Sequence, residues 1–89
     1  MTASNDGSEV ATKFLVIHDL ELQREMYLEF DIETNSICVS DLKTIVCDTW
    51  TGLTHRGFIF IDKGKIFQAH EQITLRVKLY TYLKILILL

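Results

Sequence analysis

The sequence of 89 residues has no proline, four glycines and two cysteines. Without proline or a glycine-rich stretch it offers no linker, so we expect a single domain. It also has no glycine-rich loop of the kind that cradles phosphate, and we expect no cofactor. Cys38 and Cys47 are too few for a disulfide framework, which favours a reducing compartment, the cytoplasm or the nucleus.

Clustered positive charge and long apolar runs are also missing. Nine Lys and Arg residues are scattered among 12 Asp and Glu residues, giving a net charge of −3, whereas nucleic-acid binding needs clustered cations. Residues 79–89 are strongly apolar, but a membrane-spanning helix needs about 20 residues, and this shorter stretch contains Lys84. Residues 1–9 are polar and acidic, unlike a signal peptide. We therefore expect neither a nucleic acid nor a membrane as partner.

The remaining composition is typical of a folded protein, with 48% hydrophobic and 24% charged residues. Residues 1–12 are rich in Ser, Thr, Asn, Asp and Gly, and we expect them to form a flexible arm. Residues 13–89 then form the domain. A domain of this size buries roughly 60–65% of its unfolded surface, so nearly every apolar strand residue matters for stability.

Two apolar patterns near the N-terminus predict a β-hairpin. Residues 14–17 form a continuous apolar run, which is typical of a strand buried on both faces. Residues 26–33 alternate, which predicts a half-buried strand with an acidic side in water. The apolar side consists of Met26, Leu28, Phe30 and Ile32, and the other side of Tyr27, Glu29, Asp31 and Glu33.

A helix is expected next, over residues 37–50. Asn35 or Ser36 could cap its N-terminus, and Gly52 is placed to end it. The apolar positions recur at the three- and four-residue spacing of an amphipathic helix: Val39, Leu42, Ile45 and Val46.

The C-terminal half predicts further strands. They are expected at residues 58–61, 66–67 and 83–89, with a turn at 62–65 in which Gly64 can adopt a positive φ. Residues 68–80 leave two interpretations open. They alternate at Ile73, Leu75, Val77 and Leu79, as a strand would, but a loop with one short helical turn fits as well.

The order of elements predicts an α+β fold. A single helix can cover only one face of a sheet. The first and last strands are almost continuously apolar, as central strands are, so we place them side by side and parallel. The second strand lies outside the first, and the strand at residues 58–61 outside the last. This mixed four- to five-stranded sheet, with one main helix packed on one face, is the β-grasp.

Three runs of the sequence resemble the ubiquitin-like family: residues 41–48, 60–65 and 83–89. In that family a helix with a Val-Lys-x-x-Ile type pattern precedes a strand, a Gly-Lys turn and a final strand of alternating leucines. The resemblance covers residues 13–89, and the smaller ubiquitin-fold modifiers match its C-terminal part about as well as ubiquitin does. It implies the β-grasp fold and a role in protein binding.

The sequence departs from the family's modifiers at its C-terminus. The modifiers continue into a flexible tail with a terminal glycine, whereas this chain as given ends at Leu89. Conjugation uses the carboxylate of that glycine, so we expect none from the chain as written. Lys65, the lysine of the Gly-Lys turn, is present, but one lysine says little about the building of modifier chains.

Strand parity predicts which side chains lie on the face that the helix leaves uncovered. Lys84 should point away from the core, and Leu86 lies on the same side of the last strand. The same reasoning places Leu15, Ile17, Ile59 and Ile61 outward, and Phe14, Val16, Phe58 and Phe60 inward.

These outward residues are the predicted protein-binding site. Burying an apolar side chain of this kind gains about 1.5–3 kcal/mol, so a group left in water favours a partner. The resemblance implies the same face, because Ile61, Lys84 and Leu86 occupy the family's usual docking positions. Two alternatives stay open: ordinary exposed aliphatic residues, or cover by residues 68–80.

Other candidate sites have simpler interpretations. The acidic side of residues 26–33 could bind a basic partner, but solvated outer strands commonly look the same. Cys38 and Cys47 point in opposite directions on a helix, and the histidines are dispersed, so we expect no metal site. A nucleophilic pair of Cys47 and His55 would lack an orienting group, so we expect no catalytic residue. The simpler interpretation of Cys47 is a small buried thiol.

The sequence therefore predicts a non-catalytic ubiquitin-like interaction module in the cytoplasm or nucleus. Its expected partners are helices or loops of ubiquitin-pathway or receptor-type proteins, with weak self-association through the apolar face as a further option. One alternative is a modifier whose glycine tail is missing from this chain. Another is a Ras-association-type β-grasp adaptor, which the acidic second strand disfavours. An enzyme ranks last.

Overall fold

The computed structural model describes residues 12–77 and 80–88. The predicted arm lies outside these residues except for Thr12, which begins the first strand. Along the chain the elements are β1 (Thr12–Asp19), β2 (Arg24–Asp31), β3 (Ser36–Cys38), α1 (Val39–Thr49), β4 (Phe58–Asp62), β5 (Lys65–Phe67), β6 (Gln72–Thr74) and β7 (Tyr80–Ile87).

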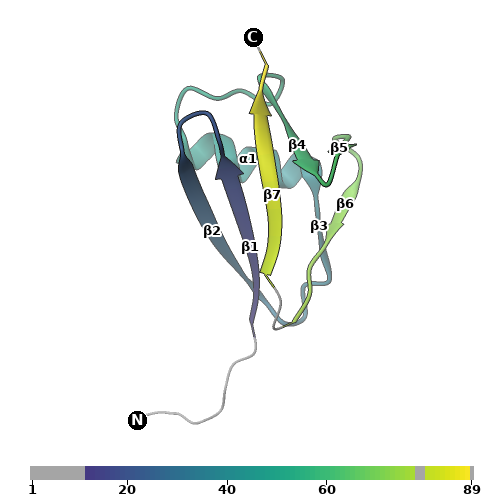
Figure 1. Ribbon diagram of the computed structural model, residues 1–89. Coiled ribbons are helices and arrows are strands. Elements are labelled where there is room, and N and C mark those ends of the chain that lie inside the picture. Colours follow the sequence, from purple (N-terminus) through teal and green to yellow (C-terminus); the bar gives the residue numbers. More distant parts are fainter. Residues whose placement is uncertain (1–11, 78–79, 89) are drawn as a thin grey trace, which may run out of the picture.

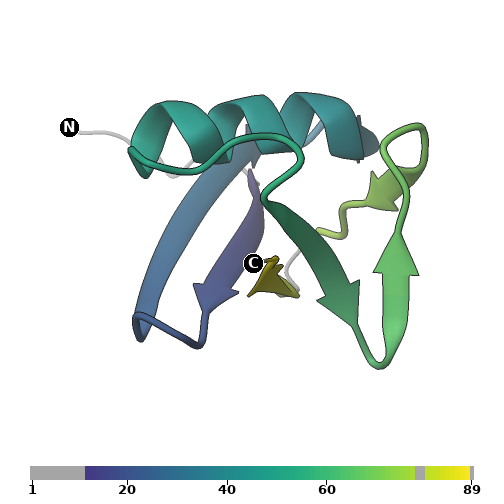
Figure 2. The ribbon, with the colours of Figure 1, turned by 90° about the horizontal axis from the view of Figure 1, so that it is seen from above.

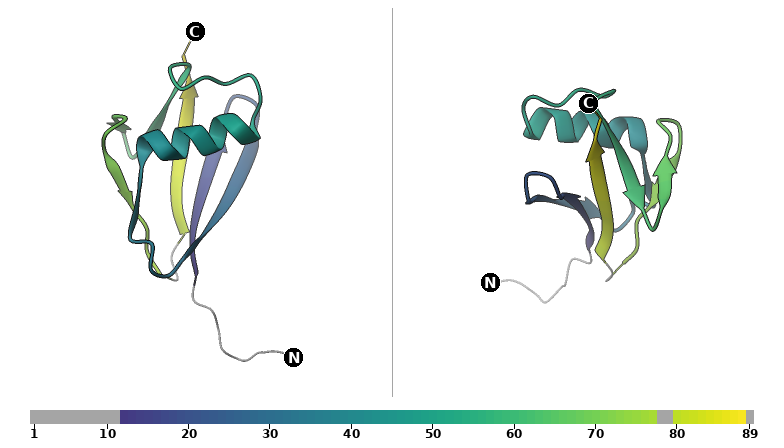
Figure 3. Two further views of the ribbon diagram at one scale, coloured as in Figure 1. Left: turned by 180° about the vertical axis from the view of Figure 1, so that it is seen from behind. Right: turned by 45° about the horizontal axis from the view of Figure 1, so that its top comes forward.

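Five strands form one mixed sheet in the order β2-β1-β7-β4-β5 (Figure 1). The central strands β1 and β7 are parallel, while β2 pairs with β1, β4 with β7 and β5 with β4 in antiparallel fashion. Helix α1 packs across one face of this sheet (Figures 2 and 3). The chain thus has a β-grasp-like α+β fold, and the predicted placement of the two terminal strands is confirmed.

The hydrophobic core lies between α1 and the sheet. Phe58 and Phe60 of β4 are fully buried there, with their ring centroids 5.4 Å apart in an edge-to-face arrangement that suits the aromatic quadrupoles. The buried residues of the core are Leu15, Ile17, Met26, Val39, Leu42, Val46, Phe58, Phe60, Ile73, Leu75, Leu83 and Ile85.

The predicted orientation of β1 was wrong. Leu15 and Ile17 are fully buried in the core, so it is Phe14 and Val16 that lie on the opposite face of the sheet. Four consecutive apolar residues contain no alternation, so the run itself could not fix which side faces the helix. Of the polar residues that flank the run, Lys13 and Asp19 are buried on the core side with Leu15 and Ile17, whereas His18 is partly exposed on the open face.

Lys13 precedes the apolar run and Asp19 follows it after His18, and both charged residues lie on the core side of β1. Lys13 is 4% exposed, and its Nζ donates to the carbonyl oxygen of Thr34 at 2.9 Å. Asp19 is 0% exposed and forms an ion pair with Arg24 at 3.0 Å. Because the ammonium of Lys13 and the carboxylate of Asp19 each have a hydrogen-bonding partner, their burial at the two ends of the strand is tolerated.

Strand β2 has the predicted alternation. Met26 is buried, and Leu28 and Phe30 pack against the core, while Tyr27 and Glu29 on the other side are exposed. The strand ends at Asp31, so the last residues of the alternating pattern belong to the turn that follows. The half-buried strand with a polar outer side is therefore confirmed.

Helix α1 ends as predicted but begins differently. The backbone N–H of Trp50 closes the last turn on the carbonyl of Val46 at 2.8 Å, and Gly52 follows with φ of +94°. At the other end neither Asn35 nor Ser36 caps the helix. The N-cap residue is Cys38, and it makes no side-chain capping bond.

Backbone carbonyls replace the missing side-chain cap. The N–H groups of Val39 and Ser40 donate to the carbonyls of Glu71 and Ala69, at 2.9 and 3.0 Å. These first N–H groups have no partner within the helix, so the segment before β6 satisfies them. The start of α1 is consequently set by a long-range contact rather than by local sequence.

Strands β3 and β6 form a separate two-stranded sheet that the sequence did not predict. Ser36 pairs with Thr74 and Cys38 with Gln72. Of the two interpretations of residues 68–80, the strand is correct for 72–74, where Ile73 points into the core. The end of the predicted alternation, Leu79, lies outside the described residues.

Strands β4 and β5 and their turn match the prediction, and Gly64 has φ of +84°. The last strand, β7, begins three residues earlier than predicted and ends at Ile87. Leu89 lies outside the described residues.

Candidate protein-interaction face

The registers of β4 and β7 bring together four of the predicted site residues. Ile61 lies opposite Lys84, and Ile59 lies opposite Leu86. Residues opposite each other on paired strands share a face, and their neighbours Phe60 and Ile85 occupy the core side. The four therefore lie on the face away from α1, as predicted. We call this group of Ile59, Ile61, Lys84 and Leu86 the β4–β7 patch.

The patch is accessible to solvent. Leu86 is 50% exposed, Lys84 is exposed, and Ile59 and Ile61 are partly exposed. No helix or strand of the described residues lies over this side of the sheet (Figures 1 and 3). The segment proposed as a cover is residues 68–80. Its part up to residue 77 runs beside the sheet and supplies β6 instead.

Strand β5 extends the patch toward the edge of the sheet. Ile66 lies opposite Ile61, on the same face, and is 49% exposed. The sequence indicated a short returning strand here but assigned no side to its residues. Pairing with Ile61 could have identified Ile66, because a tight turn fixes the register of a hairpin.

A second apolar row crosses β2, β1 and β7. Val16 lies opposite Tyr27 on one side and Tyr82 on the other. Val16 is fully buried although it faces away from the helix, whereas the two tyrosines are 62% and 59% exposed. Flanking aromatic side chains thus shield the centre of this face and leave their own edges in water. Sequence parity missed this row because it assigned Val16 to the core.

Polar groups border the patch beside Lys84. His18, opposite Lys84 in the register, places its Nδ1 3.2 Å from a carboxylate oxygen of Glu25. Tyr27 donates its hydroxyl to the other oxygen of that carboxylate at 2.8 Å. Glu25 is therefore already engaged by two neighbours. Across the described residues, Lys84 forms no ion pair, so its ammonium is available to an incoming carboxylate.

Two predicted site residues do not belong to this face. Leu15 and Ile17 are sealed in the core beneath α1 and cannot contact a partner in the folded protein. The residues of β1 that lie on the open face are instead Phe14, Val16 and His18.

The buried polar groups inside the fold serve to hold it together. Lys43 donates to the carbonyls of His55 and Phe58 at 2.7 and 2.8 Å, which ties α1 to the loop before β4. Burial lowers the pKa of Lys43. Burial also raises the pKa of the Cys47 thiol, with a further contribution from the charge of Asp48. A raised thiol pKa is the opposite of what a nucleophilic cysteine needs.

Within residues 12–77 and 80–88 no group of three or more His, Cys, Asp or Glu side chains is arranged to hold a metal ion. The same part of the chain contains no helix long and apolar enough to cross a membrane. Comparison of the sequence with protein-family models and with curated proteins finds no match.

Proposed function

We propose that this chain is a non-catalytic, ubiquitin-like protein-interaction module that acts in the cytoplasm or nucleus and binds its partner through the β4–β7 patch. The observation that carries the proposal is the pairing of Ile61 with Lys84 and of Ile59 with Leu86 on a face that α1 does not cover. An apolar cluster beside an accessible cation is a common plan for the centre and rim of an interface.

The chemistry of the patch specifies the partner. Ile61 and Leu86 offer apolar surface at its centre, and Ile66 extends that surface to the sheet edge. Lys84 stands at one side, where it would pair with a carboxylate. An amphipathic helix or loop with an apolar stripe flanked by an acidic residue satisfies both requirements. The chain's own acidic row on β2 disfavours a partner that approaches that edge with negative charge.

Replacing both Ile61 and Leu86 with serine should weaken binding strongly without unfolding the domain. Each lost apolar contact removes about 1.5 kcal/mol or more, so the double variant should bind roughly 100-fold more weakly. The probe is an amphipathic helix of the ubiquitin-binding class with one acidic residue beside its apolar stripe. Amide chemical shifts, followed as the peptide is added to the ¹⁵N-labelled full chain, give both the affinity and the site.

The matched control replaces two exposed apolar residues outside the patch. Leu22, in the loop after β1, is 62% exposed, and Ile32, in the turn after β2, is 45% exposed. Their double serine variant should bind like the original chain. Reversing the charge of Lys84 with glutamate should weaken binding, and a peptide with lysine in place of its acidic residue should restore it. Shifts confined to other surfaces, or equal affinity of the patch and control variants, would remove the assignment.

A further inference from the structure

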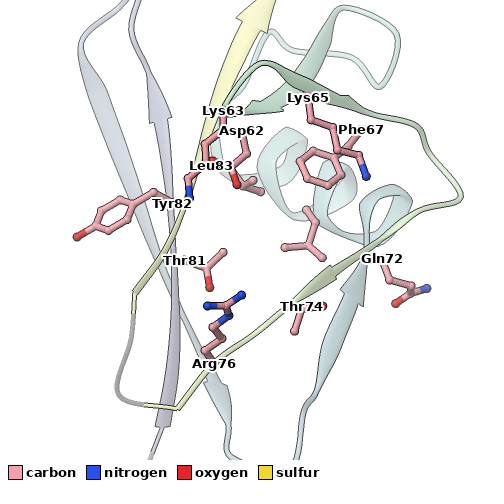
Figure 4. Close-up of a pocket in the computed structure, with 11 residues that line it drawn as sticks. Asp62, Lys63, Lys65, Phe67, Gln72, Thr74, Arg76, Thr81, Tyr82 and Leu83 are labelled. Atoms are coloured by element: carbon pink, nitrogen blue, oxygen red, sulfur yellow. The ribbon is translucent and has the colours of Figure 1, made fainter.

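A pocket of about 500 Å³ opens at the side of the molecule where the β4–β5 turn, β6 and β7 meet (Figure 4). Its volume is in the range of small-molecule sites in proteins. None of the four residues of the β4–β7 patch lines it, so it is a separate feature. The lining residues are Asp62, Lys63, Lys65, Phe67, Gln72, Ile73, Thr74, Arg76, Thr81, Tyr82 and Leu83.

The charge of this pocket opposes that of the whole chain. Lys63, Lys65 and Arg76 are three of the nine Lys and Arg residues in a chain of net charge −3, while Asp62 is the single acidic residue in the lining. A local excess of positive charge in an acidic protein attracts anions to one place.

One of the three cations is already neutralised. Lys65 places its Nζ 3.1 Å from a carboxylate oxygen of Glu71 and 4.8 Å from the centre of the Phe67 ring. The hydrogen bond from the backbone N–H of Gln68, together with Lys65, lowers the pKa of Glu71 and so favours its charged form. Lys65 thus helps to form the wall rather than to bind a ligand.

The other two cations are available. The side chains of Lys63 and Arg76 form no ion pair or hydrogen bond with any other residue in the described ranges. Figure 4 shows Arg76 pointing from the segment after β6 toward Thr81 and the interior of the pocket. A guanidinium can donate two parallel hydrogen bonds to a carboxylate or a phosphate, and the hydroxyl of Thr81 can donate a third.

The remaining wall is apolar. Ile73 and Leu83 are buried, at 4% and 1% exposed, and the ring of Phe67 is half-buried. The side-chain amide of Gln72 is held by the hydroxyl of Ser36 at 3.0 Å. A ligand would therefore meet cations at one side of the pocket and hydrocarbon at the other.

We propose that this pocket binds an organic anion, a carboxylate or phosphate carried on a small aromatic or apolar group. Arg76 binds the anion through two parallel hydrogen bonds, the hydroxyl of Thr81 donates a third, and Lys63 supplies a second positive charge. The apolar part of the ligand packs against Phe67 and Ile73. The anion can come from a free small molecule or from a side chain of a peptide, and the experiment separates these sources.

Phenyl phosphate, added to the ¹⁵N-labelled full chain, is expected to shift the amide signals of Arg76, Thr81 and Lys63 in a saturable way. Benzoate should do the same more weakly, and phenol, which lacks the charge, should not. A blocked phosphotyrosine peptide tests the second source: tighter binding than phenyl phosphate assigns the site to peptide side chains, and weaker binding assigns it to free small anions.

Replacing Arg76 with glutamine should weaken phenyl phosphate binding at least tenfold, and replacing it with lysine several-fold, because lysine keeps the charge but loses the bidentate geometry. The control is Arg56→Gln, which removes an exposed arginine outside the pocket and should leave the affinity unchanged. Unchanged spectra elsewhere establish that each variant is folded. Equal binding of phenol, or equal losses in the Arg76 and Arg56 variants, would overturn the proposal and leave the β4–β7 patch unaffected.

Discussion

Replacing Phe60 with alanine is expected to lower the free energy of unfolding by about 3–5 kcal/mol. The Phe60 ring is fully buried, packs edge-to-face on Phe58, and lies between Ile85 of β7 and Phe67 of β5 in the strand register. A void at this central position removes contacts on three strands at once. Because small domains are stable by only about 5–15 kcal/mol in total, the loss is a large fraction. Urea unfolding followed by circular dichroism measures it.

The matched control for this cavity is Ile66→Ala on the neighbouring strand. Ile66 also belongs to the main sheet but is 49% exposed on the open face, so its truncation should cost under about 1 kcal/mol. Similar losses for the Phe60 and Ile66 variants would mean that the core does not lie between α1 and this side of β4.

The second large effect is expected from Asp19→Ala, which should lower the free energy of unfolding by about 3 kcal/mol. The Asp19 carboxylate is wholly buried, forms the ion pair with Arg24, and accepts hydrogen bonds from the backbone N–H groups of Glu21 and Leu22 at 3.0 and 3.3 Å. Removing it leaves Arg24 without its carboxylate and frees the β1–β2 loop. A buried ion pair that loses one member destabilises a fold strongly.

Arg24 also connects this ion pair to the end of the helix. The carbon at the centre of its guanidinium lies 4.2 Å from the centre of the Trp50 ring, which follows the last turn of α1. The Asp19→Asn variant retains an oxygen that can accept the hydrogen bonds of the loop, so it should lose less stability than the Asp19→Ala variant. Asp31→Ala, an exposed acid at the end of β2, should stay within about 0.5 kcal/mol of the original. Chemical unfolding of the three variants checks the order; equal stability of the Asp19 and Asp31 alanine variants would contradict it.

The strands with a charged residue in their pattern could be oriented from sequence. In β7 the single charge of Lys84 fixed the outward side, and with it Leu86. In β2 the acidic residues did the same for Met26 and its neighbours. In β1 the same rule fails, because the charged residues Lys13 and Asp19 lie on the core side and the polar residue His18 lies on the open face. The error in assigning Leu15 and Ile17 follows directly from this.

The order of the sheet was predictable for a different reason. Near-continuous apolar runs mark central strands, and placing both terminal strands in the centre, with one helix to cover one face, satisfies that pattern. The start of α1 and the β3–β6 ladder were not predictable. Both depend on pairing between residues 36–40 and 69–74, which are far apart in sequence and carry no local signal in strands of three residues.

The pocket could not have been found from sequence either. Its cations, Lys63 and Arg76, are separated along the chain and meet only because the β4–β5 turn and the segment after β6 approach the same side of β7. The scattered basic residues suggested no anion site. The β4–β7 patch, by contrast, was predicted residue by residue for the four positions that lie on β4 and β7.

Methyl proton relaxation by a soluble gadolinium chelate tests the one-sided cover of the sheet most directly. The methyl groups of Ile61 and Leu86 should relax strongly, because they face solvent on the side away from α1. Those of Leu15 and Ile17 should be protected to the same degree as those of Leu42, inside the core. Equal protection of Ile61 and Ile17 would show that both faces of the sheet are covered and would contradict the account.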